Sequence, residues 1–276
     1  MTKPKTLTKT SIEWTDYSWN PIRARNRRTG KTGHHCEHAS PGCLNCYSEK
    51  GWNRRFGTGL AFTRQNRDAV DVFLDEERLH ARMPRAPAKI FLCDMTDMFA
   101  GFVPDEWIDR ILDVAELHPR YTYQLLTKRP ERMLDYLAIR SPRGKWPMSN
   151  VRLGTSVEDG GRLERLDVMR VIPAAIRFVS FEPLLEDLGA IYLDGIDWVI
   201  TGAESGSGAR PMYLDWVRNI RDHCVAAGVP FFFKQNAARG KKLPTPEPDG
   251  RQWHEFPVAH QTAECTNAPF DAGRGA

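Results

Sequence analysis

The chain of 276 residues lacks the features of a membrane or secreted protein. It has no run of about 18 apolar residues, so we expect no membrane-spanning helix. Residues 1–10 are basic but lack the apolar core of a secretory signal, and we expect them to be flexible. A hydrophobic content of 41% and a charged content of 27% are ordinary for a globular protein. We therefore expect a cytoplasmic protein.

Cysteine is also scarce. Six cysteines in the whole chain do not suggest a disulfide framework, which fits a reducing compartment. Three are scattered, and the other three fall within eleven residues, at Cys36, Cys43 and Cys46. We place them in one loop, residues 34–50, and call it the cysteine loop. Thiolates this close repel one another unless a soft cation holds them, usually zinc or the iron of an iron–sulfur cluster.

The residues of the cysteine loop leave both occupants open. A structural zinc ion takes four ligands, whereas a cluster held by three thiolates leaves one iron free for chemistry. Zinc would need His34, His35 or His38 as its fourth ligand. His38 lies only two residues from Cys36, which strains a shared site, so the other two histidines suit zinc better. In this alternative the protein binds zinc and nucleic acid.

The net charge of +4 is unevenly distributed. Residues 1–67 hold 13 Lys and Arg against 4 Asp and Glu, a balance of +9, so the rest of the chain carries −5. This positive charge surrounds the cysteine loop, close to Trp52 and Phe56. Cations and aromatic rings together suit phosphate contact and base stacking. The basic N-terminal third therefore predicts a nucleic-acid partner, and a solvated surface loop is the simpler interpretation.

After the cysteine loop, short apolar strands alternate with helical patterns. Helices are predicted to start at Pro104, at Pro130 and near Asp215, the last one ending at Gly228. This alternation indicates an α/β fold with a parallel sheet. The number of units favours a full or partial (β/α) barrel of the TIM-barrel kind, although periodicity leaves a doubly wound sheet open. The expected strands are residues 11–14, 89–93, 122–127, 151–155, 176–180, 197–201 and 229–234.

The composition changes near the end of the chain. Residues 237–276 carry several prolines and glycines and little apolar periodicity, which predicts an extended C-terminal tail. We therefore expect a single domain over residues 11–236, with the cysteine loop near its start.

Polar residues follow six of the expected strands at the point where each strand ends. In β/α barrels this edge carries the chemistry. Glu182 and Glu204 follow apolar strands directly, where a carboxylate is costly to bury unless it is paired or binds a ligand. An ion pair with a cation such as Lys128 or Lys234 is the simpler interpretation. A further alternative is a hydrolase or nuclease in which both glutamates and Asp94 hold a divalent metal.

Six motifs follow one another in the chain. They are Ile12-Glu-Trp-Thr-Asp16, Trp19-Asn-Pro21, Ser40-Pro-Gly-Cys43-Leu-Asn-Cys46-Tyr-Ser-Glu49, Leu125-Leu-Thr-Lys-Arg-Pro130, Ser180-Phe-Glu-Pro-Leu-Leu185 and Gly202-Ala-Glu-Ser-Gly206. In this order they resemble a phage and prophage family of unknown function that is defined by three cysteines. That family is in turn similar to radical S-adenosylmethionine (SAM) enzymes, which have a β/α barrel and a three-cysteine cluster loop. This chain has six residues between its first two cysteines, where the usual radical SAM motif has three, and Ala203 where the family more often has glycine.

The resemblance implies that the three cysteines hold a 4Fe-4S cluster whose fourth iron binds SAM. It implies a radical enzyme in which reduction cleaves SAM to a 5′-deoxyadenosyl radical that abstracts a substrate hydrogen. Nucleic acid or a nucleotide is the leading substrate, and the implied partners are an electron donor such as flavodoxin or ferredoxin and a phage-encoded protein. The implied cofactor-binding residues are Asp94, Thr96, Asp97, Ser156, Glu158, Gly202 and Ser205, and the implied catalytic residues are Glu182, Glu204 and Lys128.

Overall fold

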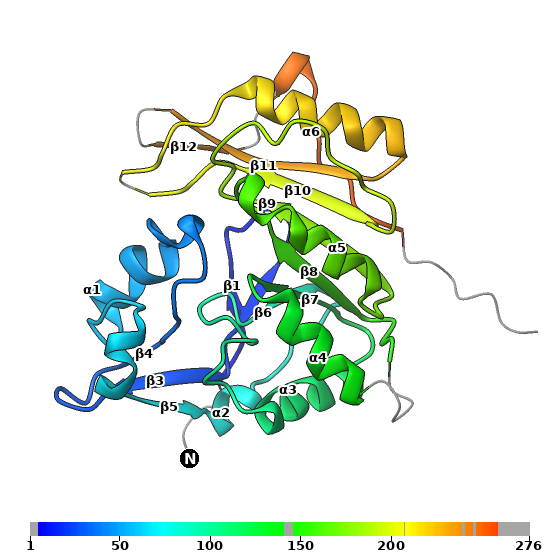
Figure 1. The fold of residues 1–276 in the computed structure, drawn as a ribbon. Coiled ribbons are helices and arrows are strands. Elements are labelled where there is room, and N and C mark those ends of the chain that lie inside the picture. Colours follow the sequence, from blue (N-terminus) through cyan, green and yellow to red (C-terminus); the bar gives the residue numbers. More distant parts are fainter. Residues whose placement is uncertain (1–4, 141–145, 207, 239–240, 245–246, 259–276) are drawn as a thin grey trace, which may run out of the picture.

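The computed structural model describes residues 5–140, 146–206, 208–238, 241–244 and 247–258 (Figure 1). Its centre is a nine-stranded sheet, and a three-stranded sheet lies beside it. None of the described helices has the length and apolar character needed to cross a membrane. The chain is thus a mixed α/β protein, as the alternation of patterns predicts.

Seven strands of the large sheet are parallel, and their order in the sheet follows their order in the chain. This order never reverses, unlike that of a doubly wound sheet. At the two edges, β1 (Thr8–Lys9) and β12 (Lys241–Pro244) pair antiparallel. The parallel strands are β2 (Tyr17–Trp19), β6 (Lys89–Leu92), β7 (Thr122–Thr127), β8 (Val151–Ser156), β9 (Ile176–Phe181), β10 (Trp198–Gly202) and β11 (Phe231–Ala238).

A long excursion of the chain between β2 and β6 carries the cysteine loop. It contains the antiparallel small sheet, with β3 (Ile22–Asn26) between β4 (Thr32–Gly33) and β5 (Val70–Leu74). Figure 1 shows this excursion as a separate lobe on one side of the large sheet. Its helical segments are η1 (Pro41–Cys43), η2 (Tyr47–Asn53), α1 (Arg54–Phe56), η3 (Arg64–Ala69) and α2 (Glu76–Leu79).

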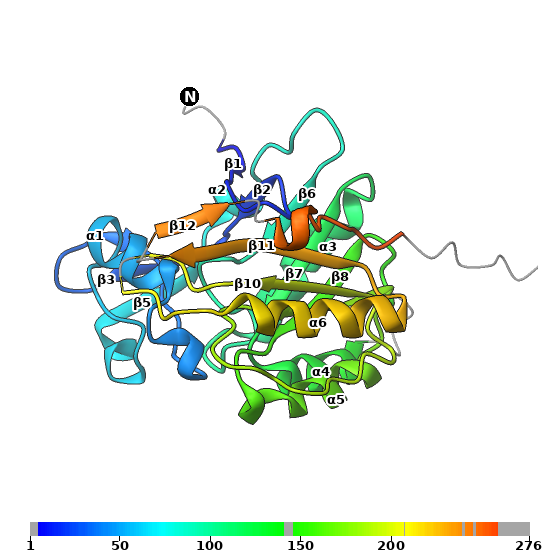
Figure 2. The same ribbon diagram turned by 90° about the horizontal axis from the view of Figure 1, so that it is seen from above.

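The longer helices lie on the outer face of the large sheet. Each of them follows a parallel strand. Because crossovers between parallel strands are right-handed, a sheet of constant strand order places all such helices on one face. Figures 1 and 2 show α4, α5 and α6 on that face. The three predicted helices are confirmed, and the last ends at Gly228 in the left-handed conformation, with φ of 67°. The helices are α3 (Asp105–Leu117), α4 (Pro130–Arg140), α5 (Glu164–Val171) and α6 (Leu214–Ala227).

The large sheet is strongly curled. The buried ring of Trp14 lies 4.6 Å from Phe91 on β6 and 6.2 Å from both Phe178 on β9 and Trp198 on β10. In a flat sheet β6 and β10 would stand about 19 Å apart, because four strand spacings of about 4.8 Å separate them. One indole can contact both strands only if the sheet bends around it. Trp14 therefore fills the inner face of the curl.

The sheet accounts for most of the predicted strands, but the first one is wrong. Residues 11–14 form no strand but lead into a turn at Glu13 and Trp14, and the strand lies just after them at β2. The apolar side chains of Ile12 and Trp14, which suggested a strand, instead pack inside the curled sheet. The six later strands are confirmed to within four residues at each end.

The two chain ends are more structured than the sequence suggests. Residues 5–10 were expected to be flexible, yet they include β1, while residues 1–4 lie outside the described residues. β11 continues past residue 236, and Glu255 accepts a hydrogen bond at its backbone oxygen from Trp198 Nε1, 2.8 Å away. The ring of His254 stacks on Phe232 at 4.6 Å. The part of the expected tail around His254 and Glu255 thus packs against the sheet, and residues 259–276 lie outside the described residues.

Candidate functional site

A cavity lies where the parallel strands end, and the cysteine loop forms one of its walls. Its floor is apolar, with Trp14, Phe91 and Leu126 from the inner face of the sheet. The cavity brings together most residues that the sequence nominated, although they come from distant parts of the chain. These are Cys36, Cys43, Cys46, Asp94, Thr96, Asp97, Lys128, Ser156, Glu182, Glu204 and Ser205.

Two nominated residues do not line this cavity. Glu158 is completely buried beneath the cysteine loop. Gly202 ends β10, and its backbone lies so close to Glu182 and Gln235 that a Cβ there would come within 3.3 Å of the Glu182 carboxyl carbon. The expectation that these two residues bind a cofactor directly finds no support in their positions.

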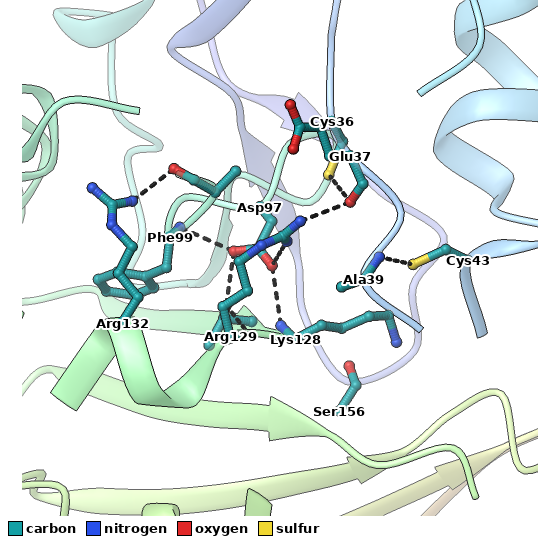
Figure 3. Close-up of polar contacts among 12 residues, drawn as sticks. Cys36, Glu37, Ala39, Cys43, Asp97, Phe99, Lys128, Arg129, Arg132 and Ser156 are labelled. Carbon is teal, nitrogen blue, oxygen red and sulfur yellow. Dashed lines mark hydrogen bonds and ion pairs between the residues drawn. The ribbon is translucent and has the colours of Figure 1, made fainter. Parts of the chain in front are cut away.

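The cysteine loop is held at its first half by side chains from the ends of β7 and β8. Arg129 Nη2 donates to the backbone oxygen of Glu37 at 2.8 Å (Figure 3). Ser40 Oγ donates to Glu158 at 2.6 Å. A Cβ on Gly42 would come within 2.5 Å of Glu158, so glycine at this position allows the loop to approach the carboxylate.

The second half of the loop is held by the segments after β6 and β10. Asn45 Nδ2 donates to Glu204 at 2.9 Å. The hydroxyl groups of Tyr47 and Ser48 donate to the backbone oxygens of Asp94 and Met95, at 3.0 and 2.9 Å. Residues between and beside the cysteines are thus attached to four different strand ends, which fixes the thiols relative to the cavity.

Glu158 is the most buried charge of this arrangement. It accepts hydrogen bonds from Lys128 Nζ, from Ser40 and, at 3.1 Å, from Arg165. Burial would raise the pKa of this carboxyl, but the two cations and the hydroxyl outweigh it and lower the pKa. Glu158 is therefore ionised and joins the cysteine loop to β8 and α5.

Glu204 has a similar role on the opposite side. Its carboxylate accepts from Asn45 and from the backbone and guanidinium nitrogens of Arg210, two of them at 2.9 and 3.0 Å. Burial opposes ionisation, yet these donors lower the pKa of Glu204. Arg210 Nη2 also donates to the backbone oxygen of Pro41 at 3.1 Å. Arg210 therefore connects the loop after β10 to the cysteine loop. The sequence did not indicate a role for it.

The three thiols are partly buried among two cations and a backbone N–H group. Burial is the main cause that raises the pKa of Cys36 to about 12, and it raises the pKa of Cys46 as well. Ionised thiolates here would therefore require nearby positive charge. Arg129 partly opposes the rise in the pKa of Cys36, and Lys128 partly opposes that of Cys46. The backbone N–H of Ala39 donates to Cys43 Sγ at 3.4 Å (Figure 3).

Several buried polar atoms of the cavity have no hydrogen-bond partner among the described residues. They include Ser180 Oγ on β9, Thr96 Oγ1 after β6 and Trp14 Nε1 on the floor. Leaving such groups unpaired in a folded protein costs about 1–3 kcal/mol each. The sequence did not predict a ligand-binding role for Ser180. Side chains alternate between the two faces of a strand, so Ser180 lies on the same inner face as Phe178, two residues before it. These atoms are available to bind a ligand.

The charged groups deeper in the cavity are mostly paired. Glu182 accepts from Lys234 Nζ at 2.5 Å and from Gln235 Nε2 at 2.7 Å, as the simpler interpretation of this carboxylate expects. Asp97 accepts from Thr127 Oγ1 at 2.7 Å and from Arg129 Nη1 at 2.8 Å (Figure 3). Asp97 therefore fixes the end of β7. It holds in place the arginine that contacts the cysteine loop.

Asp94 differs from the other acids because no cation pairs with it in the described part of the chain. Asn20 Nδ2 donates to its carboxylate at 2.5 Å. Burial raises the pKa of Asp94 above its usual value. A carboxylate of this kind gains from binding a positively charged group of a ligand.

The arrangement of candidate metal ligands in the cavity bears on which group the three thiols could hold. No three His, Cys, Asp or Glu side chains of the described residues form a group compact enough to bind one ion. A cluster bonds each thiolate to a different iron, so it requires three thiols around one space rather than around one point. His34 and His35 do not line the cavity, and burial lowers their pKa values to about 3 and about 4. His38 binds Glu49 at 2.7 Å.

The fold and the site together define an α/β protein with a cavity of cysteines and polar residues at the ends of its parallel strands. Residues 9–257 match a protein family described as "Protein of unknown function (DUF5131)", and the chain belongs to this family. Searches of curated proteins and of solved structures found no match. The family description assigns no activity, so the function is inferred from the cavity.

Proposed function

We propose that this protein is a radical SAM enzyme and that Cys36, Cys43 and Cys46 bind a 4Fe-4S cluster. One observation carries the proposal: all three thiols face the cavity into which the strand ends project. When bound, the reduced cluster and SAM supply a 5′-deoxyadenosyl radical that removes a hydrogen atom from the substrate. The curl of the sheet and its constant strand order favour a partial (β/α) barrel as the scaffold.

In this proposal the side chains of the protein would bind the cluster and SAM, orient them and exclude water from them. Lys128 and Arg129 stabilise the negative charge of the thiolates. Asp94 binds the amino group of SAM, and Thr96 and Ser180 supply hydrogen bonds to the bound ligand. The apolar floor around Trp14 excludes water from the site where the radical forms. Glu158 and Glu204 do not touch the reacting groups but position the cysteine loop.

Glu182 and Lys234 are the best-placed pair to contact the substrate. Both line the cavity and are joined by a hydrogen bond of 2.5 Å. We propose nucleic acid or a nucleotide as the substrate. An electron donor such as flavodoxin or ferredoxin and a phage-encoded protein are the proposed partners.

Anaerobic purification and reconstitution with iron and sulfide test the proposal. The protein should turn brown, and the electron paramagnetic resonance spectrum of its reduced form should change when SAM is added. Incubation with a reductant should then release 5′-deoxyadenosine.

The zinc alternative predicts a different result. A colourless protein that retains stoichiometric zinc after reconstitution and does not respond to SAM would overturn the proposed function. The third alternative, a metal-dependent hydrolase or nuclease, would retain its activity when the cysteines are replaced.

A further inference from the structure

The segment after the cysteine loop has an unusual surface. Four large apolar side chains are exposed within 13 residues, among them Leu44 with an exposed fraction of 57% and Phe56 with 71%. Scattered exposed apolar residues are normal, but a local group of them marks a binding surface. We call this surface the aromatic–basic face; its residues are Leu44, Tyr47, Lys50, Trp52, Arg54, Arg55 and Phe56.

The charge of this segment is of one sign. Residues 38–67 contain five lysines and arginines and a single acid, Glu49. Glu49 is buried, and its carboxylate is occupied by His38 at 2.7 Å and by the backbone N–H of Phe62 at 2.8 Å. Its other carboxylate oxygen lies 3.9 Å from Arg54 and offsets the charge of that cation. Arg55 has no ion-pair partner among the residues that the structure describes.

The local structure presents these side chains outward. In η2 the buried residues are Ser48, Glu49 and Asn53, whereas Tyr47 and Trp52 are each partly exposed. Asn53 anchors the segment through hydrogen bonds to the backbone of His34 and Thr58, at 2.9 and 3.2 Å. The exposed rings are thus carried by a fixed backbone, which reduces the entropy lost when a ligand binds.

The aromatic–basic face is continuous with the cavity. Tyr47 belongs to both, because it lines the cavity and is half exposed. Figure 1 shows the lobe that carries α1 standing apart from the helices that cover the sheet. A long ligand bound to the face can therefore extend into the cavity beside the cysteines.

We infer that the aromatic–basic face binds a single strand of nucleic acid and delivers it to the cavity. Exposed rings stack on unpaired bases, and cations without acidic partners contact the phosphates. A duplex keeps its bases stacked on one another, so it could use only the cations. The inference names the substrate class of the proposed enzyme and so extends the proposed function. Binding of the strand needs neither cluster nor SAM. The inference can therefore fail while the proposed function holds, and the reverse is also possible.

Fluorescence anisotropy with the full-length protein tests this inference. The probes are a labelled 12-residue oligothymidylate, an abasic oligomer of equal length and a 12-base-pair duplex. The oligothymidylate should bind most tightly. Phe56→Ala should weaken its binding about fivefold or more, the value of one lost stacking contact, and should leave the abasic oligomer unaffected.

Arg55→Ala should weaken binding of both single-stranded probes. It should also reduce the salt dependence of binding by about 0.7 in log K against log salt, as expected for one lost phosphate contact. Tyr192→Ala and Arg85→Ala are the matched controls, because both side chains are exposed elsewhere on the protein, and neither change should affect binding.

Three results would overturn the inference. The wild-type protein could bind the thymidylate and abasic probes equally well, which would exclude stacking. The control variants could weaken binding as much as Phe56→Ala and Arg55→Ala. Finally, the oligothymidylate could fail to bind while an acidic protein such as flavodoxin binds, which would assign the face to a protein partner.

Discussion

The large sheet and the cysteine loop are stabilised in different ways. The sheet and its helices are held by buried apolar side chains that alternate along each strand, as on β11, where Phe231 and Phe233 face the helices and Phe232 faces the inside of the curl. The loop has little apolar packing and is attached through hydrogen bonds to Arg129, Glu158 and Glu204. Apolar packing tolerates many substitutions, whereas a polar attachment depends on single atoms. The site should therefore be lost more easily than the fold.

The largest expected effect comes from the thiols themselves. Changing Cys36, Cys43 or Cys46 to Ala should abolish cluster binding while the fold remains, because each removes one iron ligand. The measurements are iron content and visible absorption after reconstitution, together with circular dichroism. Cys265→Ala is the control and should retain the cluster. Loss of the cluster in this control would contradict the ligand assignment.

Removal of Glu158 should have the next largest effect. Glu158→Ala leaves Lys128 and Arg165 without their shared carboxylate, and breaking a buried ion pair costs about 3–5 kcal/mol of stability. Urea unfolding followed by circular dichroism measures the change. Glu186→Ala is the matched control, since this exposed glutamate accepts only the N–H of Gly160 in the described residues and should cost less than about 1 kcal/mol. Equal losses in both variants would show that the loop is not held by Glu158.

Weakening the contact of Glu204 with Asn45 should loosen the loop without unfolding the protein. Glu204→Gln should speed the reaction of the cysteine-loop thiols with a thiol reagent in the cluster-free protein by about tenfold, because a hydrogen bond to a charged group is worth about 1.5–3 kcal/mol. The labelling rate of the metal-free protein measures this. Glu186→Gln serves as the control. An unchanged rate in Glu204→Gln would mean that this contact does not restrain the loop.

The smallest expected effect is a change in acid stability. The pKa of Glu158 is lowered from its usual value of 4.5, so the folded state binds fewer protons than the unfolded state. Its contribution to stability is complete above about pH 4.5 and is lost as the pH falls toward the folded-state pKa. The urea midpoint of the wild type should therefore fall more between pH 6 and pH 4 than that of Glu158→Gln. An equal fall in the urea midpoint of the wild type and of Glu158→Gln between pH 6 and pH 4 would contradict this expectation.

Much of the fold could be predicted from local sequence. The apolar runs predict six of the seven parallel strands, and the prolines at 104 and 130 predict where two helices begin. The exception is informative: Ile12 and Trp14 are apolar enough for a strand, but the curl of the sheet offers them an interior to fill. Periodicity reports that a residue is buried, but not which element buries it.

The attachments of the cysteine loop could not be predicted. Ser40 and Glu158 are 118 residues apart, and Asn45 and Glu204 are 159 apart, so no spacing in the sequence relates them. Glu204 looked like a ligand-binding residue because a carboxylate directly after an apolar strand is costly to bury, and Glu158 because the resemblance implied it. The structure shows that their partners belong to the cysteine loop and to neighbouring cations.

The sequence by itself determined the three clustered cysteines, the order of strands and helices and the positive charge around the loop, because each depends on residues that are near one another in the chain. Only the tertiary structure decided that Ser180 and Thr96 face the cavity without partners and that Tyr47 joins the cavity to the aromatic–basic face. The physical reason is the curl of the sheet. It brings the ends of strands that would be about 19 Å apart in a flat sheet around one space.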